Sequence, residues 1–196
     1  MAKRFILILG GARSGKSDLA RKLGLDIGGH VTFVATAEAK DDEMRRRIEA
    51  HQRSRPASWR TLEVPLHVAD ALEREAAPDA IVLDCVGLWV SNLLAANSPS
   101  GLDQPDEEAT QNALSQELGA FHDWYRGNGA SLIVVSNEVG MGLVPPFPSG
   151  RVFRDLLGWA NQRLATMATE VYLVIAGIPI DLKKFAIQPW KQDGPH

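Results

Sequence analysis

The stretch that decides the fold reads Gly-Gly-Ala-Arg-Ser-Gly-Lys-Ser and occupies residues 10–17, directly after the apolar run Phe5–Leu9. It fits the pattern G-x-x-x-x-G-K-[ST], in which glycines let backbone N–H groups turn inward around phosphate oxygens. Lys16 places a positive charge against the outer phosphates, and Ser17 offers a hydroxyl to Mg²⁺. A helix is expected over residues 18–23, with the positive end of its dipole toward the anion. Strand, loop and helix together predict a site for a nucleoside triphosphate, because a chance match would lack this setting.

Four further apolar runs lie outward of this stretch, at residues 31–35, 80–83, 132–135 and 171–175. They are rich in Val, Ile and Leu and do not alternate with polar residues, which is typical of strands buried on both faces of a parallel sheet. Apolar residues repeat at helix spacing over residues 114–125, and a less regular stripe covers residues 152–167. Strands that alternate with helices predict a wound α/β layer fold.

Length and charge bound the class of protein. The chain has 196 residues and a net charge of −3, which fits one α/β domain without a basic field that would attract nucleic acid. Cys85 is the one cysteine, so no disulfide forms within the chain and a reducing compartment is expected. No apolar run reaches the roughly 18 residues that a membrane span needs. We therefore expect a cytoplasmic protein with no membrane span.

Two long loops and the C-terminal tail interrupt the regular pattern. Residues 97–106 and 145–150 are rich in proline and glycine, so both are predicted to be surface loops. Long loops in compact domains often serve as lids or binding segments, but flexible connections without such a role are as common. The tail after Leu182 contains Pro189 and Gly194 and is expected to be loosely ordered. The predicted organisation is one domain at residues 1–182 and a tail at residues 183–196.

A carboxylate ends the third apolar run. The sequence Ile-Val-Leu-Asp at residues 81–84 has the form of a Walker B element, whose acidic residue holds Mg²⁺ directly or through water. An aspartate at a strand end is also a common helix cap. Asp84 is therefore a candidate for the metal side of the site, with the capping role as the alternative.

A histidine closes a helical pattern at residues 41–51, where Met44, Ile48 and His51 fall on one stripe. Acidic residues begin this pattern, as suits the helix dipole, and Pro56 prevents it from continuing. By composition alone His51 is more often a surface or boundary histidine. The arginines at residues 45–47 are likewise more often a solvated face than a phosphate site.

Taken together, the motifs resemble those of one family. Besides residues 10–17 they are Asp42-Glu-Met with Arg47-Ile and His51, Arg55-Pro-x-x-Trp59-x-Thr-x-Glu63, and Val135-Ser-Asn-Glu-Val-Gly-Met-Gly142. Over about residues 4–182 the chain is similar to the bifunctional adenosylcobinamide kinase/adenosylcobinamide-phosphate guanylyltransferase family of cobalamin biosynthesis. This resemblance implies a single P-loop NTPase domain of RecA-like type, with a mostly parallel central sheet flanked by helices. The proline-rich turn at residues 145–150 departs from the charged loop expected there.

The resemblance also implies two reactions. The kinase phosphorylates the aminopropanol hydroxyl of adenosylcobinamide with ATP or GTP, and the transferase passes GMP from GTP to the new phosphate and releases pyrophosphate. By motif match the GMP travels on His51, whose neutral imidazole is a good nucleophile near pH 7. Mg²⁺ and a homotrimer are implied as well.

The residues implied to contact the nucleotide come from several segments. They are Gly10, Gly11, Ala12, Arg13, Ser14, Gly15, Lys16, Ser17, Ala35, Thr36, Ala37, Gln52, Arg53, Ser54, Arg55, Glu63 and Asp84, of which Ser17 and Asp84 would also face Mg²⁺. By its chemistry Glu63 suits guanine N–H groups. Asn137 and Glu138 are candidates for metal binding or for accepting the hydroxyl proton, or are plain anchors at a strand end. Arg154, Asp155 and Asn161 would serve the corrinoid or a subunit contact, or would bond to one another.

Two other functions stay open at this level. A small-metabolite kinase would use the phosphate loop without a histidine intermediate, and a nucleotide-dependent switch would use hydrolysis to exchange partners. A switch needs a water-positioning residue and mobile switch segments. The sequence identifies neither, while a plain kinase leaves His51 and its surrounding motif without a role.

Overall fold

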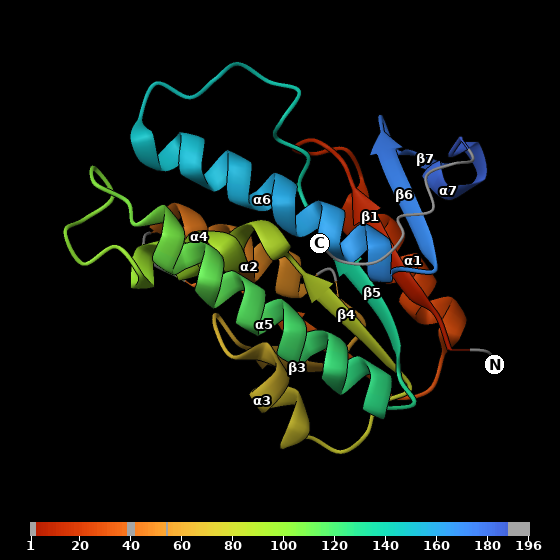
Figure 1. The fold of residues 1–196 in the computed structure, drawn as a ribbon. Coiled ribbons are helices and arrows are strands. Elements are labelled where there is room, and N and C mark those ends of the chain that lie inside the picture. Colours follow the sequence, from red (N-terminus) through yellow and green to blue (C-terminus); the bar gives the residue numbers. More distant parts are fainter. Residues whose placement is uncertain (1–2, 39–41, 54, 188–196) are drawn as a thin grey trace.

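The computed structural model describes residues 3–38, 42–53 and 55–187. Its strands are β1 (Phe5–Leu9), β2 (Val31–Ala35), β3 (Arg60–Glu63), β4 (Ala80–Asp84), β5 (Ser131–Val135), β6 (Glu170–Ile175) and β7 (Ile178–Asp181). They form one sheet in the order β3-β2-β4-β5-β1-β6-β7 (Figure 1). Neighbouring strands are parallel except β6 and β7, which form an antiparallel hairpin. The predicted α/β fold with a mostly parallel sheet is confirmed.

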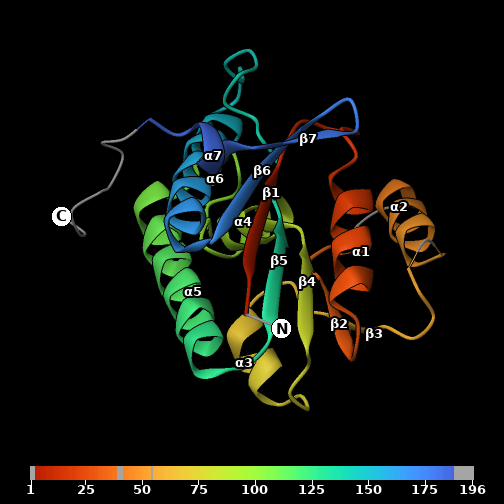
Figure 2. The same ribbon diagram turned by 90° about the vertical axis from the view of Figure 1, so that its right-hand side faces the viewer.

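Helices fill the connections between the strands. They are α1 (Lys16–Ile27), α2 (Asp42–Arg53), α3 (Val68–Glu73), α4 (Val86–Ala96), α5 (Glu107–Gly127), α6 (Pro148–Met167) and α7 (Leu182–Phe185). Figure 2 shows α1 and α2 on one side of the sheet and α5 and α6 on the other. Among the residues described, no helix combines the length and the hydropathy needed to cross a bilayer.

The central strands bury both of their faces, as the unbroken apolar runs predict. In β1, Phe5 and Leu7 join the core under α3 to α6, while Ile6 and Ile8 join a second core that includes Ala20 of α1. Successive side chains of a strand point to opposite faces, so each run supplies both cores at once. This is why the sequence of β1 shows no polar alternation.

Two strands, the start of one helix and a short helix near the C-terminus differ from the sequence-based expectation. The edge strands β3 and β7 were not predicted, because β3 is short and polar and β7 contains Pro179. The loop expected at residues 145–150 is shorter, since α6 begins at Pro148 and proline is well accommodated in the first turn of a helix. Lys183 to Phe185, expected in the loose tail, belong to α7, and residues 188–196 lie outside the described part.

The strand order places the candidate site. The chain leaves β1 toward β2 and β4 on one side of the sheet, and β6 lies on the other side. Such a switch point opens a crevice at the carboxyl ends of the strands. The register sets Glu63, Ala35 and Asp84 level with one another across β3, β2 and β4.

Candidate nucleotide site

The phosphate loop follows β1 and depends on two glycines. Gly10 has φ 155°, and a Cβ atom there would lie 2.5 Å from the Val174 carbonyl oxygen and 2.7 Å from Ser14 Oγ. Gly15 is left-handed at φ 99° and directly precedes α1. These backbone conformations suit glycine and turn the loop into the N-terminus of a helix, where anions bind well.

Lys16 lies over the loop. The residue is 7% exposed, and its ammonium donates to the Gly11 carbonyl at 2.6 Å. Burial lowers the pKa of this side chain from its ordinary value, and the Asp84 carboxylate opposes that shift. Ser14 Oγ is also buried and has no hydrogen-bond partner among the residues that the structure describes. A phosphate oxygen would relieve both groups, since an ammonium and a hydroxyl are its ordinary donors.

Two distant segments brace the loop. The Glu138 amide, just beyond β5, donates to the Gly10 carbonyl at 3.0 Å. The Gly177 amide, in the turn between β6 and β7, donates to the Ser14 carbonyl at 2.8 Å. The loop is therefore held at its start and near its end by residues from the other half of the chain.

The end of β2 is fixed to the end of β4. Thr36 Oγ1 accepts from the Cys85 amide at 3.0 Å and donates to the Cys85 carbonyl at 2.7 Å. Asn92 of α4 donates to the Thr36 carbonyl at 2.8 Å and to the Pro65 carbonyl at 3.3 Å. Burial and Asp84 raise the pKa of the Cys85 thiol to about 12, so this thiol stays protonated and unreactive near neutral pH.

Arg55 is the second cation near this edge. Its guanidinium carbon lies 3.7 Å from the centre of the Phe33 ring. Nε and Nη1 are buried and have no hydrogen-bond partner within the described part of the chain. Burial lowers the pKa of this side chain, while the nearby Asp84 and Glu63 carboxylates oppose that shift. Because buried charges are normally hydrogen-bonded, two open donors beside the phosphate loop indicate a place for an anionic ligand.

A pocket of about 560 Å³ opens beside α2 and the ends of β2 and β3. Its lining residues are Ala37, Glu38, Arg45, Ile48, Gln52, Glu63 and Pro65. Gln52 Nε2 donates to Glu63 Oε1 at 3.0 Å. Three of the predicted nucleotide contacts therefore line one pocket that is large enough for a base.

The remaining predicted residues differ in their exposure to solvent. Ala12 and Arg13 are exposed on the phosphate loop, Arg53 is exposed at the end of α2, and Ala35 and Thr36 are buried. Ser17 is half-buried in the first turn of α1. His51 belongs to α2, but its side chain lies outside the described residues, as does Ser54.

Two buried asparagines support strand ends at the site, a role that the sequence did not predict. Asn161 was expected to serve the corrinoid or a subunit contact, or to bond to Arg154 or Asp155. Ser136 Oγ donates to Asn161 Oδ1 at 2.6 Å, and Asn161 Nδ2 donates to the Asn137 carbonyl at 3.0 Å. Asn161 thus fixes the end of β5 from α6, and Asn92 does the same for β2 from α4. For Asn92 the signal is an asparagine among the apolar residues of α4, since a buried amide needs partners, whereas the mixed sequence of α6 gives no such signal for Asn161.

Local bonds account for two other candidate groups. Glu138 Oε1 accepts from the Gly140 amide at 2.5 Å and from the Met141 amide at 3.3 Å. Arg154 Nε donates to Asp155 Oδ1 at 3.0 Å. These contacts agree with the anchoring alternative for Glu138 and with the simple pairing of Arg154 and Asp155.

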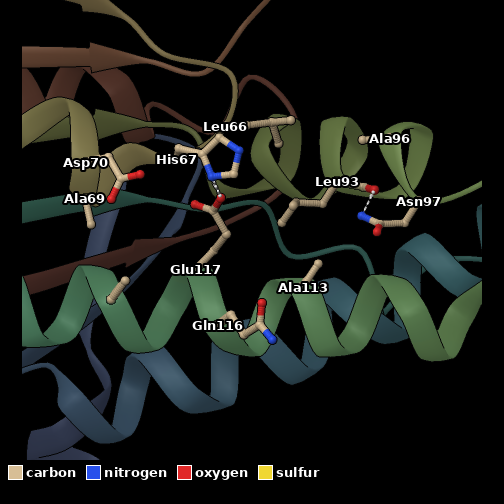
Figure 3. Close-up of a pocket in the computed structure, with 11 residues that line it drawn as sticks. Leu66, His67, Ala69, Asp70, Leu93, Ala96, Asn97, Ala113, Gln116 and Glu117 are labelled. Atoms are coloured by element: carbon tan, nitrogen blue, oxygen red, sulfur yellow. Dashed lines mark hydrogen bonds and ion pairs between the residues drawn. The ribbon is translucent and has the colours of Figure 1, made fainter.

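A second pocket, of about 360 Å³, lies between α3, α4 and α5 (Figure 3). His67 adopts a left-handed conformation there, and its amide and Nδ1 both lie 2.9 Å from Glu117 Oε1. The walls of this pocket contain several alanines and leucines, including Ala69 and Leu93. None of the predicted nucleotide contacts lines this pocket.

Known proteins are similar to this chain over all the segments that form the site. Over residues 6–182 the sequence matches the family described as cobinamide kinase / cobinamide phosphate guanyltransferase. It is 43% identical over 178 residues to the bifunctional adenosylcobalamin biosynthesis protein CobP of Pseudomonas aeruginosa, covering 90% of this chain and 96% of that protein. It is 42% identical over 180 residues to the bifunctional adenosylcobalamin biosynthesis protein CobU of Salmonella typhimurium, covering 91% and 99%. Among solved structures, the RadB recombinase matches with a TM-score of 0.47 and 17% identity, covering 87% of this chain and 73% of that one.

Proposed function

The chain belongs to the cobinamide kinase / cobinamide phosphate guanyltransferase family, and we propose that it performs both reactions on adenosylcobinamide. It first phosphorylates the aminopropanol hydroxyl with ATP or GTP, and then attaches GMP from GTP to that phosphate. The observation that carries the proposal is a buried Lys16 and a half-buried Arg55, both of which feel the charge of Asp84, together with a base-sized pocket at the ends of β2 and β3.

The kinase step needs positioning and charge neutralisation. The acceptor hydroxyl releases its proton to solvent as its oxygen forms a bond to the γ-phosphorus. The bond to the bridging oxygen breaks, and the nucleoside diphosphate leaves with that electron pair. Lys16 and the amides of residues 10–17 stabilise the charge that spreads over the phosphate oxygens. Burial of Lys16 strengthens this effect, because its charge acts in a medium of low dielectric constant.

The guanylyltransferase step uses His51 as a carrier. An imidazole nitrogen bonds to the α-phosphorus of GTP, and pyrophosphate leaves with the electron pair of the broken bond. A phosphate oxygen of the acceptor then attacks the same phosphorus and releases the imidazole. One difficult displacement is thereby divided into two easier ones. The place of His51 in α2, between the pocket-lining residues Ile48 and Gln52, supports this role.

The base has a matching surface in the pocket. The Glu63 carboxylate accepts the guanine N1–H and amino groups, and Gln52, which bonds to Glu63, keeps that carboxylate in place. A site built to satisfy these donors rejects a base that lacks them. This accounts for the use of GTP as the source of the nucleotidyl group.

Ser17 and Asp84 fit Mg²⁺ by the chemistry of their oxygens. A hydroxyl and one carboxylate suit this ion, which keeps several waters and binds nucleotide phosphates for its remaining contacts. Asp84 is level with Val135 of β5, which is level with Ile8 of β1, so Asp84 stands at the strand ends from which the phosphate loop leaves. When bound, the ion neutralises phosphate charge.

We also propose that the protein assembles as a homotrimer. Support comes from the β6–β7 hairpin and the segment after it, where Ile175, Ile178 and Phe185 are exposed apolar side chains. Contiguous exposed apolar residues mark contact surfaces in many proteins.

Labelling with GTP carrying radioactive α-phosphate tests the covalent step. We expect protein-bound label that is acid-labile and alkali-stable, as a phosphoramidate is, and its complete loss in His51→Ala. His30→Ala is the matched control, because this imidazole is 96% exposed and lies away from the loop at residues 10–17.

Other outcomes would favour the other functions. Transfer of γ-label alone to a small molecule, with the protein unlabelled, would favour a kinase without a carrier. Slow hydrolysis that a partner protein accelerates, with no label on protein or small molecule, would favour a switch.

A further inference from the structure

The segment that joins β5 to α6, residues 139–147 and hereafter the apolar loop, exposes four large apolar side chains. The exposed fractions are 79% for Met141, 96% for Leu143, 64% for Val144 and 69% for Phe147. Figure 1 shows this segment arching away from the helices toward the start of α6. A run of this kind is costly in water unless something covers it, so it indicates a contact surface.

Both ends of the apolar loop are fixed. At its start, Val139 packs against the main core, and the Glu138 carboxylate holds the turn at Gly140. At its end, Arg151 Nη1 donates to the carbonyls of Pro145 and Pro146 at 3.2 Å and 2.8 Å. Prolines also reduce the freedom of the unbound chain. The apolar side chains are therefore presented on a braced segment, which lowers the entropy cost of binding.

The apolar loop begins beside the phosphate loop. Glu138, the residue before it, donates its amide to the Gly10 carbonyl of the phosphate loop at 3.0 Å. The register places Val135 of β5 level with Ile8 of β1, so both strands end at the same edge. A molecule bound to the apolar loop would therefore lie next to the nucleotide site.

We propose that the apolar loop is the docking platform for the corrin macrocycle of the acceptor. The inference rests on the proposed function, because that function supplies an acceptor with a broad ring that carries methyl groups and presents apolar faces. The ring lies against Met141, Leu143, Val144 and Phe147, and its aminopropanol arm extends over Gly10 toward the terminal phosphate. The charged site then performs the chemistry, and an apolar surface beside it supplies most of the acceptor affinity.

Substitution of the two most prominent side chains tests the platform. Leu143→Ser removes a side chain that has almost no packing in the folded chain, so the variant is expected to fold. Phe147→Ser places a favoured capping residue at the N-cap of α6, which carries no side-chain cap now. Leu102→Ser, on the loop at residues 97–106, is the control for a partly exposed leucine elsewhere.

Steady-state kinetics with adenosylcobinamide and a nucleotide-binding titration separate the two substrates. We expect the double variant Leu143→Ser/Phe147→Ser to raise the KM for adenosylcobinamide about tenfold or more. Its affinity for GTP and its labelling by GTP should equal those of the wild type, and Leu102→Ser should change nothing. Equilibrium dialysis of adenosylcobinamide without nucleotide should show the same loss of affinity.

Three outcomes would overturn the platform. An unchanged KM in the double variant, with an active wild type, would reject the platform and leave the proposed function standing. Loss of the native oligomer mass in the double variant, measured by sedimentation, would make the apolar loop a subunit contact instead. A wild type that binds GTP but never phosphorylates adenosylcobinamide would reject the proposed function and this inference with it.

Discussion

At the scale of single residues, the site depends on a position too crowded for any side chain and on donors without a partner in the described part of the chain. Gly10 has no space for a Cβ atom, and two nitrogens of Arg55 lack acceptors. Both features are local departures from what stability alone favours, and such departures gather at functional sites. They also make the site testable by changes of a few atoms.

Gly10→Ala should abolish nucleotide binding. The added carbon would lie 2.5 Å from the Val174 carbonyl oxygen, on a backbone conformation that alanine adopts only with strain. We expect a loss of GTP affinity of at least about a hundredfold by titration. Gly119→Ala is the control, because a Cβ there meets nothing within 4 Å. Near-normal GTP affinity in Gly10→Ala would contradict the proposed role of the loop.

Arg55→Met should separate stability from binding. Methionine keeps the stacking on Phe33 and removes a buried charge whose Nε and Nη1 lack partners, so the nucleotide-free protein should be as stable as the wild type or more stable. Loss of charge-assisted bonds to phosphate should weaken GTP binding about tenfold to a hundredfold. Thermal unfolding and a GTP titration check the two effects, and a variant that binds GTP normally would argue against an anion at Arg55.

The roles of some site residues could be predicted from the sequence, and the roles of others could not. Residues 10–17 were recognisable because phosphate binding requires glycine, lysine and serine at this fixed spacing. Asn92 and Asn161 were not found as supports. The carbonyls that they bond belong to Thr36, Pro65 and Asn137, which follow strands and lie 56, 27 and 24 residues away along the chain. Long-range partners of this kind are set by tertiary packing, which local patterns do not encode.

At the scale of elements, the strands that are buried on both sides could be predicted and the edges could not. The runs at β1, β2, β4, β5 and β6 are unbroken because each serves two cores. β3 is mostly exposed and polar, and β7 is exposed along most of its length, so neither shows a clear apolar signal. Yet β3 carries Glu63 into the pocket, and the β6–β7 turn braces the phosphate loop. The least predictable strands therefore complete the candidate site.

An ion pair links the starts of β1 and β6. Arg4 Nε and Nη2 each donate to the Glu170 carboxylate at 2.7 Å, and Tyr172 Oη donates to it at 2.8 Å. The hydrogen bonds from Arg4 lower the pKa of Glu170 below its ordinary value, although burial opposes this. The pair therefore stabilises the fold above the ordinary carboxyl pKa, and this contribution is lost as the pH falls through the lowered pKa.

Glu170→Gln should reveal that pH dependence. We expect the free energy of unfolding to fall by about 1 kcal/mol at pH 7, because both side chains are partly exposed and screened by water. The difference from the wild type should shrink as the pH is lowered toward and below about 4. Urea unfolding at several pH values measures it, and a difference that stays constant with pH would exclude the charged pair as its cause.

At the scale of the whole molecule, two apolar surfaces have different assignments. The apolar loop adjoins the phosphates and is proposed for the acceptor, while the β6–β7 hairpin and the segment after it are proposed for subunit contact. The overall α/β architecture followed from the sequence pattern. The positions of these surfaces did not follow from it. In a sequence, an exposed apolar residue of a loop or edge strand looks the same as a core residue, because only the fold shows which residues neighbours cover.

The oligomer is open to a direct measurement. Sedimentation should give a mass three times the chain mass of 21.4 kDa. The double variant Ile178→Asp/Phe185→Asp should sediment as a monomer, because charged side chains on both exposed positions oppose burial at a contact. Leu25→Asp, on an exposed position of α1, should keep the native mass. A trimer that survives the double substitution would place the contact elsewhere.

The bond from the Gly177 amide to the Ser14 carbonyl has a consequence for biosynthesis. Ribosomes release the phosphate loop early, yet β1 must wait for β5 and β6 on either side of it, and the brace at Gly177 comes far later along the chain. A nascent chain that stops before Gly177 would carry the whole glycine motif and still lack a formed cradle. Nucleotide capture is thereby deferred until the chain has been made through the β6–β7 turn.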